Sequence, residues 1–176
     1  METRLPATEL DAVHSCFRRK ELIDSFYALA EKLLWRNEPV AKCLDAAIAG
    51  GIVPEELNDS QLTLETVALL SLEVPNGGLL QFFWNRPAWV ERVPASLRLI
   101  GLPALANVFD SSTSELFSRV GAYSEFRKRD SLQAYSECAG DFSFDEFDSA
   151  YYDHEEQVYA KTIEFVSQHL GDFVAS

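Results

Sequence analysis

Residues 72–85 read LEVPNGGLLQFFWN, and this short stretch decides how the chain folds. A run of helix-compatible apolar residues is interrupted by Pro-Asn-Gly-Gly and resumes at once with amide and aromatic residues. The proline predicts that the first helix ends at Val74, because its ring lacks an amide donor and disfavours helical geometry at the preceding residue. Asn76 is a strong N-cap for a second helix, and Gly77 and Gly78, which have no Cβ, allow close approach to a neighbouring backbone. The pattern predicts a buried corner between two core helices.

The amides after the break share one face of the restarted helix. Gln81 and Asn85 are four residues apart, whereas Phe82 and Phe83 point elsewhere. We expect Gln81 to bond to carbonyls that the break leaves unpaired, and Asn85 to cap the far end of the helix. The alternative is an amide-lined binding notch with Glu73 nearby.

The remaining sequence predicts helices almost throughout. Sustained period-two alternation is absent, so sheet is at most a minor component. Helices are predicted at residues 20–35, 38–50, 62–74, 77–84, 89–100, 103–109, 111–129, 143–152 and 155–170. The predicted fold class is all-α, a single compact multi-helical domain of about eight to ten helices. Residues 1–19 are expected to form a partly flexible N-terminal extension, and residues 20–176 the helical domain.

Size and composition favour a globular protein of the cytoplasm. The chain has 176 residues, of which 47% are hydrophobic, and its 12 Phe, 6 Tyr and 3 Trp supply large side chains for a core. Apolar runs are shorter than the ~18–20 residues of a membrane span, and the N-terminus lacks the core of a signal peptide. Cys16, Cys43 and Cys138 are far apart and form no C-x-x-C pair, which fits a reducing compartment.

The charge is strongly acidic and unevenly distributed. A net charge of −13 argues against direct binding to nucleic acid or to an anionic membrane. Residues 55–85 carry five acids and no base, and residues 141–176 carry nine acids against Lys161 alone. Ordinary helix faces intersperse the two signs, so the excess in these segments points to a basic partner.

Carboxylates three or four residues apart on a helix lie about 5–6 Å apart on one face. Duplex DNA carries about one charge per 3.4 Å along each strand, so such a face can imitate phosphates to a cationic groove. The candidate phosphate-mimic residues are Asp141, Asp145, Glu146, Asp148, Asp153, Glu155 and Glu156, with Glu55, Glu56 and Asp59 as candidates to extend the same surface. The alternatives are a partner-binding or immunity-type protein that does not mimic DNA, and a solvated acidic face that only confers solubility.

Motifs for catalysis or metal binding are not found. Residues 153–156 read Asp-His-Glu-Glu, but adjacent helical residues point in different directions, and His14 and His169 have no ligand spacing toward them. Nucleophile elbows and phosphate loops are absent. Acid pairs such as Asp145 and Asp148 serve general acid–base chemistry only if burial drives their pKa values apart. We expect no enzyme, no metal and no cofactor.

The stretch ETVALLSLEVPNGGLLQFFWNRPAWVERVPASLRLIG (65–101) resembles a bacterial DNA-mimic protein family, small acidic helical proteins long known as a domain of unknown function. The resemblance extends over about residues 60–172, including Asp148, Tyr151 and Tyr152, and departs from the usual pattern at Pro75 and at Arg86-Pro87. The matching motif residues are Asn76, Gly77, Gly78, Gln81, Phe82, Phe83, Asn85, Leu97, Ile100 and Gly101.

One member of that family is described as a dimer whose surface carboxylates occupy the DNA site of a transcription factor. The resemblance therefore implies an all-α fold, a homodimer, and a basic DNA-binding protein, such as a transcriptional regulator, as partner. The surplus of aromatic residues offers Trp84, Trp89 and Phe109 as candidate dimer contacts.

Overall fold

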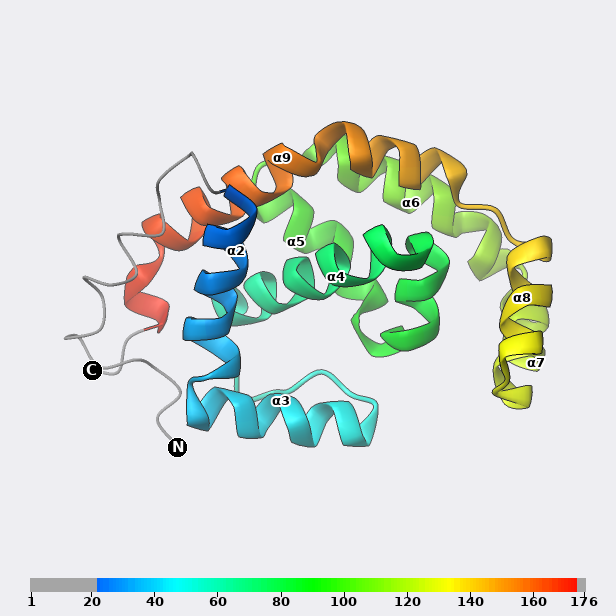
Figure 1. Cartoon of the computed structure of the whole chain (residues 1–176), viewed down its shortest axis with the longest axis horizontal. Helices are drawn as coiled ribbons and strands as arrows, with labels where there is room; N and C mark the ends of the chain where they lie inside the picture. Colours follow the sequence, from blue (N-terminus) through cyan, green and yellow to red (C-terminus); the bar gives the residue numbers. More distant parts are fainter. Residues whose placement is uncertain (1–21, 174–176) are drawn as a thin grey trace.

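The computed structural model describes residues 22–173 of the chain, and the extension predicted for residues 1–19 lies outside them. This range contains eight α-helices and no strand, which confirms the all-α class, and the helices surround one continuous core. In chain order the elements are α2 (Leu22–Ala30), the π-helical turn η4 (Glu31–Trp35), α3 (Glu38–Gly50), α4 (Asp59–Asn85), the 3-10 helix η5 (Pro87–Arg92), α5 (Val93–Leu99), α6 (Pro103–Ser118), α7 (Val120–Arg129), α8 (Leu132–Asp141), α9 (Asp145–Gln168) and the 3-10 helix η6 (Leu170–Phe173) (Figure 1).

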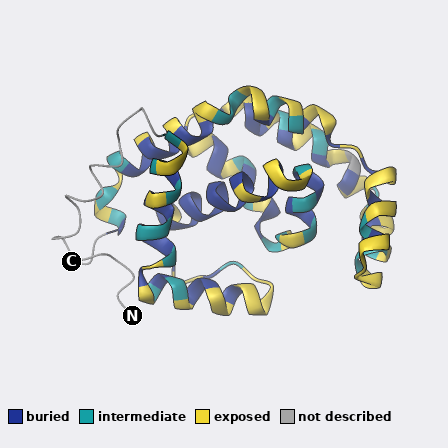
Figure 2. Cartoon of the chain, in the orientation of Figure 1, coloured by how far each residue is buried: buried dark blue, intermediate teal, exposed yellow. Residues whose placement is uncertain are grey.

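The central element is α4, whose residues 60–71 are all buried (Figure 2). Ser71 has two partners inside the core: the Tyr27 hydroxyl donates to its carbonyl, and the Tyr151 hydroxyl donates to its Oγ, each at 2.8 Å. Because buried polar groups are costly when unpaired, these bonds allow a helix with Ser and Thr to be surrounded on all sides.

The start of α4 is fixed by a capping box and by the end of the chain. Asn58 accepts a hydrogen bond from the Gln61 amide at 3.0 Å, and the Gln61 side chain accepts one from the Asn58 amide at 3.1 Å. Asn58 and Ser60 also donate to Asp172, at 2.7 and 2.6 Å. The C-terminal end of α9 therefore lies at the start of α4, and the two helices run antiparallel (Figure 1).

The break in α4 lies later than the sequence predicts. Helical geometry continues through Pro75, whose fixed φ suits a helix, and is lost at Gly77 (φ −168°, ψ 27°) and Gly78 (φ 72°, ψ −176°). The prediction that the helix ends at Val74 is therefore wrong. So is the predicted N-cap, because the Asn76 side chain donates to the Leu72 carbonyl at 2.6 Å and closes the helix before the break.

The sequence predicts a buried corner, and this prediction is also wrong. Asn76 and Gly77 are exposed and Gly78 is half-buried, because the turn projects beside α9 instead of against a neighbouring backbone. Gly78 has a conformation that is almost confined to glycine. A Cβ there would overlap the carboxylate of Asp148 on α9. The need for glycine thus comes from its dihedral angles and from an approaching side chain.

Three further helices differ from the predicted boundaries. Helix α6 runs without interruption through residues 111–113, which were predicted to start a new helix, because Thr113 and Ser114 donate to carbonyls three residues earlier. Helix α9 is likewise one helix of 24 residues where two shorter ones were predicted. Helix α8 was not predicted.

Two of the three proposed dimer contacts are core residues. Trp89 is 2% exposed and Phe109 is 1% exposed, and Phe109 packs edge-on against Phe147 at a ring distance of 5.4 Å. Neither ring is accessible to a second chain, so that prediction is wrong for both. Trp84 is half-buried and has another role.

Trp84 anchors the hairpin of α7 and α8 to the rest of the molecule. Its ring makes edge contacts with Tyr123 and Tyr135, at centroid distances of 6.3 and 5.3 Å. The Arg127 guanidinium lies 5.0 Å from the centre of the indole and donates to the Trp84 carbonyl. The hairpin forms one end of the molecule (Figure 1).

We expect Gly78→Ala to lower the free energy of unfolding by about 2–4 kcal/mol, measured by urea denaturation. About 1–3 kcal/mol comes from the backbone conformation, and about 1 kcal/mol from displacement of Asp148. Gly140→Ala in α8 is the control, because a Cβ there has no neighbour within 4 Å. If the two variants are equally stable, the corner does not require glycine.

Candidate functional site

Asp148 joins α9 to the break in α4. Its Oδ1 accepts a hydrogen bond from the Leu79 amide at 2.8 Å, so the carboxylate caps the restarted segment of α4 in the way an N-cap residue does. Partial burial raises the pKa of Asp148 above its ordinary value, opposed by the Leu79 amide and supported by the charge of Asp145. The position predicted as a phosphate mimic is thus half-buried and bonded within the fold.

A buried carboxylate connects the two sides of the break. Glu73 is 6% exposed, and its Oε2 accepts hydrogen bonds from Gln81 and Asn85, each at 2.8 Å. Its Oε1 accepts one from Arg86 Nε at 2.9 Å, which makes a charge-assisted bond. The predicted roles of Gln81 and Asn85 are therefore corrected: both amides donate to Glu73 instead of pairing a freed carbonyl or capping the helix.

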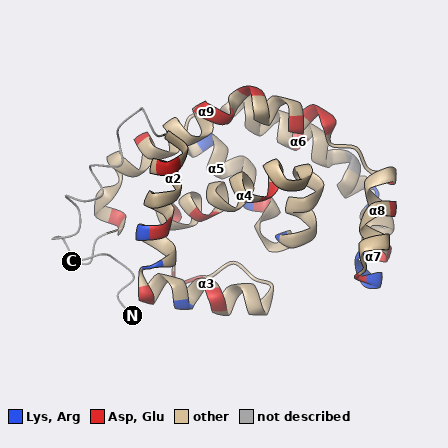
Figure 3. Cartoon of the chain, viewed as in Figure 1, with Lys and Arg blue, Asp and Glu red and all other residues tan. Residues whose placement is uncertain are grey.

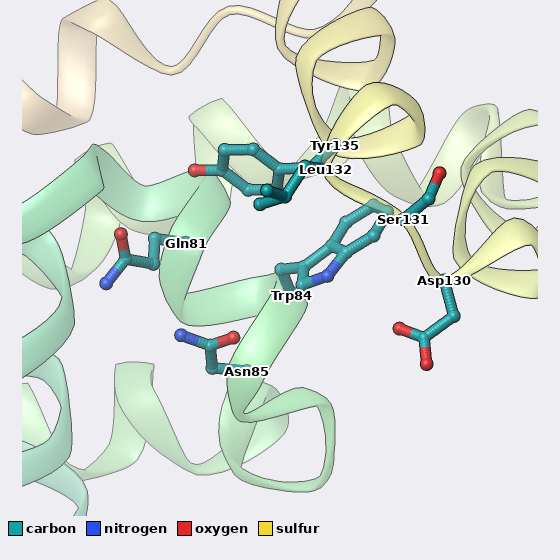
Figure 4. A pocket seen from close by; sticks show the side chains of 7 residues that line it. All are labelled: Gln81, Trp84, Asn85, Asp130, Ser131, Leu132 and Tyr135. Carbon is teal, nitrogen blue, oxygen red and sulfur yellow. The ribbon is translucent and has the colours of Figure 1, made fainter.

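A pocket of about 430 Å³ lies between the end of α4 and the hairpin. In Figure 4, Gln81, Trp84 and Asn85 face residues of α8 and of the turn before it. The amide nitrogens of Gln81 and Asn85 point to Glu73, and Leu132 on the rim is 90% exposed. The amide-lined notch that the sequence left as an alternative is present as a shallow pocket of mixed polar and apolar lining, in which Asp130 is the one acid.

The exposed acids of α9 form a second feature. We call Asp145, Glu146, Asp153 and Glu156 the acidic row; all four are exposed, and Figure 3 shows acidic residues along α9. Among residues 22–173 none of them forms an ion pair with Lys or Arg. With a helical rise of 1.5 Å per residue, the row places four carboxylates along roughly 16 Å.

The other predicted acids of this segment are engaged within the chain. Asp141 lies 3.6 Å from Arg119, and half-buried Glu155 accepts a hydrogen bond from Tyr159 at 2.9 Å. Burial raises the pKa of Tyr159 strongly.

The acids at residues 55–59 lie at the opposite end of the pair formed by α4 and α9. Glu55, Glu56 and Asp59 are exposed, and Asp59 pairs with Arg92 at 3.2 Å. The start of α4 contacts Asp172, whereas the acidic row ends at Glu156, roughly 18 Å along α9 from the C-terminal end of that helix. The structure therefore separates the two acidic segments, which the sequence analysis offered as one surface.

The described residues lack both a metal-binding cluster and a membrane-spanning helix. In residues 22–173 His, Cys, Asp and Glu nowhere gather in a group of three or more that suits a metal ion. Within the same range none of the helices is both long and apolar enough to span a membrane.

The fold and its surface define a small acidic all-helical protein with a row of carboxylates along its last long helix. The sequence model of the DMP19-like protein family matches residues 55–169, so the chain belongs to that family. Comparisons with curated proteins and with solved structures find no match.

The sequence analysis did not assign roles to Glu73 as a hydrogen-bond acceptor, to Arg86 or to Tyr135. Glu73 and Arg86 are thirteen residues apart on opposite sides of the break, and only the angle of the corner brings them together. The one available signal was Glu73 itself, an acid in an otherwise apolar stretch next to two amides. Such an acid indicates a buried partner.

We expect Asp148→Ala to destabilise the protein by about 1–2 kcal/mol, because the Leu79 amide loses its acceptor. Asp148→Asn should retain most of the stability, since its amide oxygen accepts the same bond. The control is Asp153→Ala on the exposed side of α9, expected within about 0.5 kcal/mol of the parent. Urea denaturation measures all three, and equal losses for the two alanine variants would refute the capping role.

Proposed function

We propose that the protein is a DNA mimic: it binds a basic DNA-binding protein, such as a transcriptional regulator, at the surface that otherwise contacts phosphates. The observation that supports this most is the acidic row, four exposed carboxylates without a basic partner in the described part of the chain. The proposal assigns the protein no catalytic activity and no cofactor, and places it in the cytoplasm.

The row suits this task because its support is rigid. The inner face of α9 is buried along the whole helix, from Phe147 to Val166. The backbone that carries the carboxylates is therefore fixed before a partner arrives, which lowers the entropic cost of association. Their mean spacing, about 5.5 Å of axis, is wider than the roughly 3.4 Å between phosphates along one DNA strand but of the same order.

The pocket beside Trp84 supports a second candidate function, binding of a protein partner without DNA mimicry. Its mixed lining of amides and aromatic rings and the exposed Leu132 side chain are typical of an ordinary protein-binding surface. An immunity-type protein of this kind would not compete with DNA, and this difference separates the two candidates.

We also propose a homodimer, as the family resemblance implies. Since Trp89 and Phe109 are buried, the contact surface has to come from exposed apolar side chains. The largest of these near the hairpin are Phe117, Val120 and Leu132, which are 50%, 53% and 90% exposed.

The mimicry is tested with the DNA-binding protein fraction of a lysate from the source organism, applied to the immobilised protein. We expect the retained protein to be released by added duplex DNA and by rising salt, because exposed charges are screened over about 8–10 Å at physiological ionic strength. Neutralising the acidic row should weaken retention about a hundredfold at low salt. The variant carries Asp145→Asn, Glu146→Gln, Asp153→Asn and Glu156→Gln, and it leaves Asp148 intact.

The matched control loses four charges elsewhere: Asp24→Asn, Glu55→Gln, Glu56→Gln and Glu91→Gln. These acids are exposed and lie off the acidic row, so retention should match the parent. If both variants bind equally, net charge and not the row explains binding. If added DNA leaves the bound protein in place, the partner-binding candidate replaces mimicry.

The dimer is tested by sedimentation equilibrium at tens of micromolar. We expect the parent to sediment as a dimer and Leu132→Lys as a monomer, because a charge at the contact opposes burial. Ile52→Lys, which is 57% exposed in the turn after α3, should remain a dimer. A monomeric parent would remove the proposal.

A further inference from the structure

A second cavity, of about 310 Å³, lies between α3, η4 and α4. Helix α3 is on the side of the molecule opposite α9, so this cavity is separate from the acidic row (Figure 1). Its volume is at the lower end of the range for small-molecule sites, roughly 300–1,000 Å³. The lining residues are Trp35, Ala41, Leu44, Asp45, Ile48, Glu65, Leu69, Leu72 and Arg86.

The most buried charged group in this cavity is Glu65, which is 2% exposed. Trp35 Nε1 donates a hydrogen bond to its Oε2 at 2.8 Å. Within the described part of the chain, the Glu65 side chain makes this single hydrogen bond. A carboxylate has room for about four hydrogen bonds, so Glu65 retains acceptor capacity at a cavity that it lines.

The charges around the cavity do not balance. Arg86 lines it, but its Nε is bonded to Glu73, which is itself buried. Two buried carboxylates, Glu65 and Glu73, therefore share one guanidinium. Asp45 on α3 adds a further acid to the lining, and η4 contributes Trp35. A proton or a cationic ligand has to supply the missing positive charge when the site is desolvated.

The pKa of the Glu65 carboxyl reflects its burial in this acidic surrounding. Burial raises the pKa of Glu65 to about 7, against the opposing effects of the Trp35 hydrogen bond and the charge of Arg86. Near neutral pH the carboxyl is therefore close to half-ionised, and a bound cation would compete with the proton.

We propose that this cavity binds a small organic cation, a primary ammonium group carried on an apolar body, with the ammonium donating to Glu65. The ammonium supplies the charge that the two carboxylates lack. The apolar body packs against Leu44, Ile48 and Leu69, and the half-buried Trp35 ring offers a flat surface beside the cation.

Other ligand classes fit the lining less well. A divalent metal requires several oxygen ligands, and most of this wall is aliphatic. An anion would lie between Asp45 and Glu65, and the Arg86 guanidinium that would hold it is already paired with Glu73. The proposal is independent of the DNA mimicry, because it uses different residues on the other side of the molecule.

The test is a titration of the ¹⁵N-labelled protein with phenethylammonium at pH 8, followed by the indole N–H signal of Trp35, which Trp35→Phe assigns. We expect a saturable shift of that signal. The probes 2-phenylethanol and phenylacetate have the same ring without the positive charge, and should bind at least tenfold more weakly.

Two comparisons identify Glu65 as the acceptor. Glu65→Gln keeps the shape and the Trp35 hydrogen bond, and should lower the affinity for phenethylammonium at least tenfold. Glu91→Gln, which removes an exposed acid, should leave it unchanged. In the parent the affinity should fall about tenfold from pH 8 to pH 6, because Glu65 takes up a proton across this range.

Each opposite result overturns the proposal: no saturable shift with phenethylammonium, equal binding of 2-phenylethanol, or equal affinity of Glu65→Gln and the parent. Thermal melts of both Gln variants confirm that they are folded at the temperature of the titration. Retention of the DNA-binding fraction by Glu65→Gln should be unchanged, so failure of this site and failure of the mimicry are distinguishable.

Discussion

The hydrogen bond from the Leu79 amide to the Asp148 carboxylate is the contact on which the central helices depend. It lies where α4 changes direction, next to a glycine whose positive φ other residues rarely adopt. The same carboxylate fills the space that a side chain at residue 78 would need. The last turns of α4, which carry the Glu73 partners and Trp84, are therefore oriented by a residue of α9.

Helix α9 has two faces with opposite tasks. Its inner face contributes large rings such as Phe147 and Tyr151 to the core, and its outer face carries the acidic row. Repulsion among the carboxylates is tolerated because burial of the inner face fixes the helix, at about 1.5–3 kcal/mol for each large side chain. A surface rich in one charge is thus carried by a helix that packs on α2, α4 and α6.

The all-α class was predictable because helical periodicity is written in local sequence, and the exposure of Asp145, Glu146, Asp153 and Glu156 follows from the same period. The position of the break in α4 was not predictable, because Asp148, which caps the restarted segment, is 69 residues away from Leu79. The acceptor of Gln81 and Asn85 was missed although Glu73 is only 8 and 12 residues away, because the angle of the corner decides which groups meet across the break. Burial of Trp89 and Phe109 also depends on packing, and an aromatic surplus does not tell a core ring from an interface ring.

Because Asp148 follows Leu79 by 69 residues, the corner of α4 is synthesised well before the residue that caps it. Translation proceeds at about 5–20 residues per second, so the capping residue leaves the ribosome roughly 3–14 seconds after the corner does. The capping box of α4 is local and complete much earlier. During this interval the nascent chain has the start of α4 capped, but the corner at Gly77 and Gly78 lacks its carboxylate. A chain that ends before α9 never receives the group that caps Leu79.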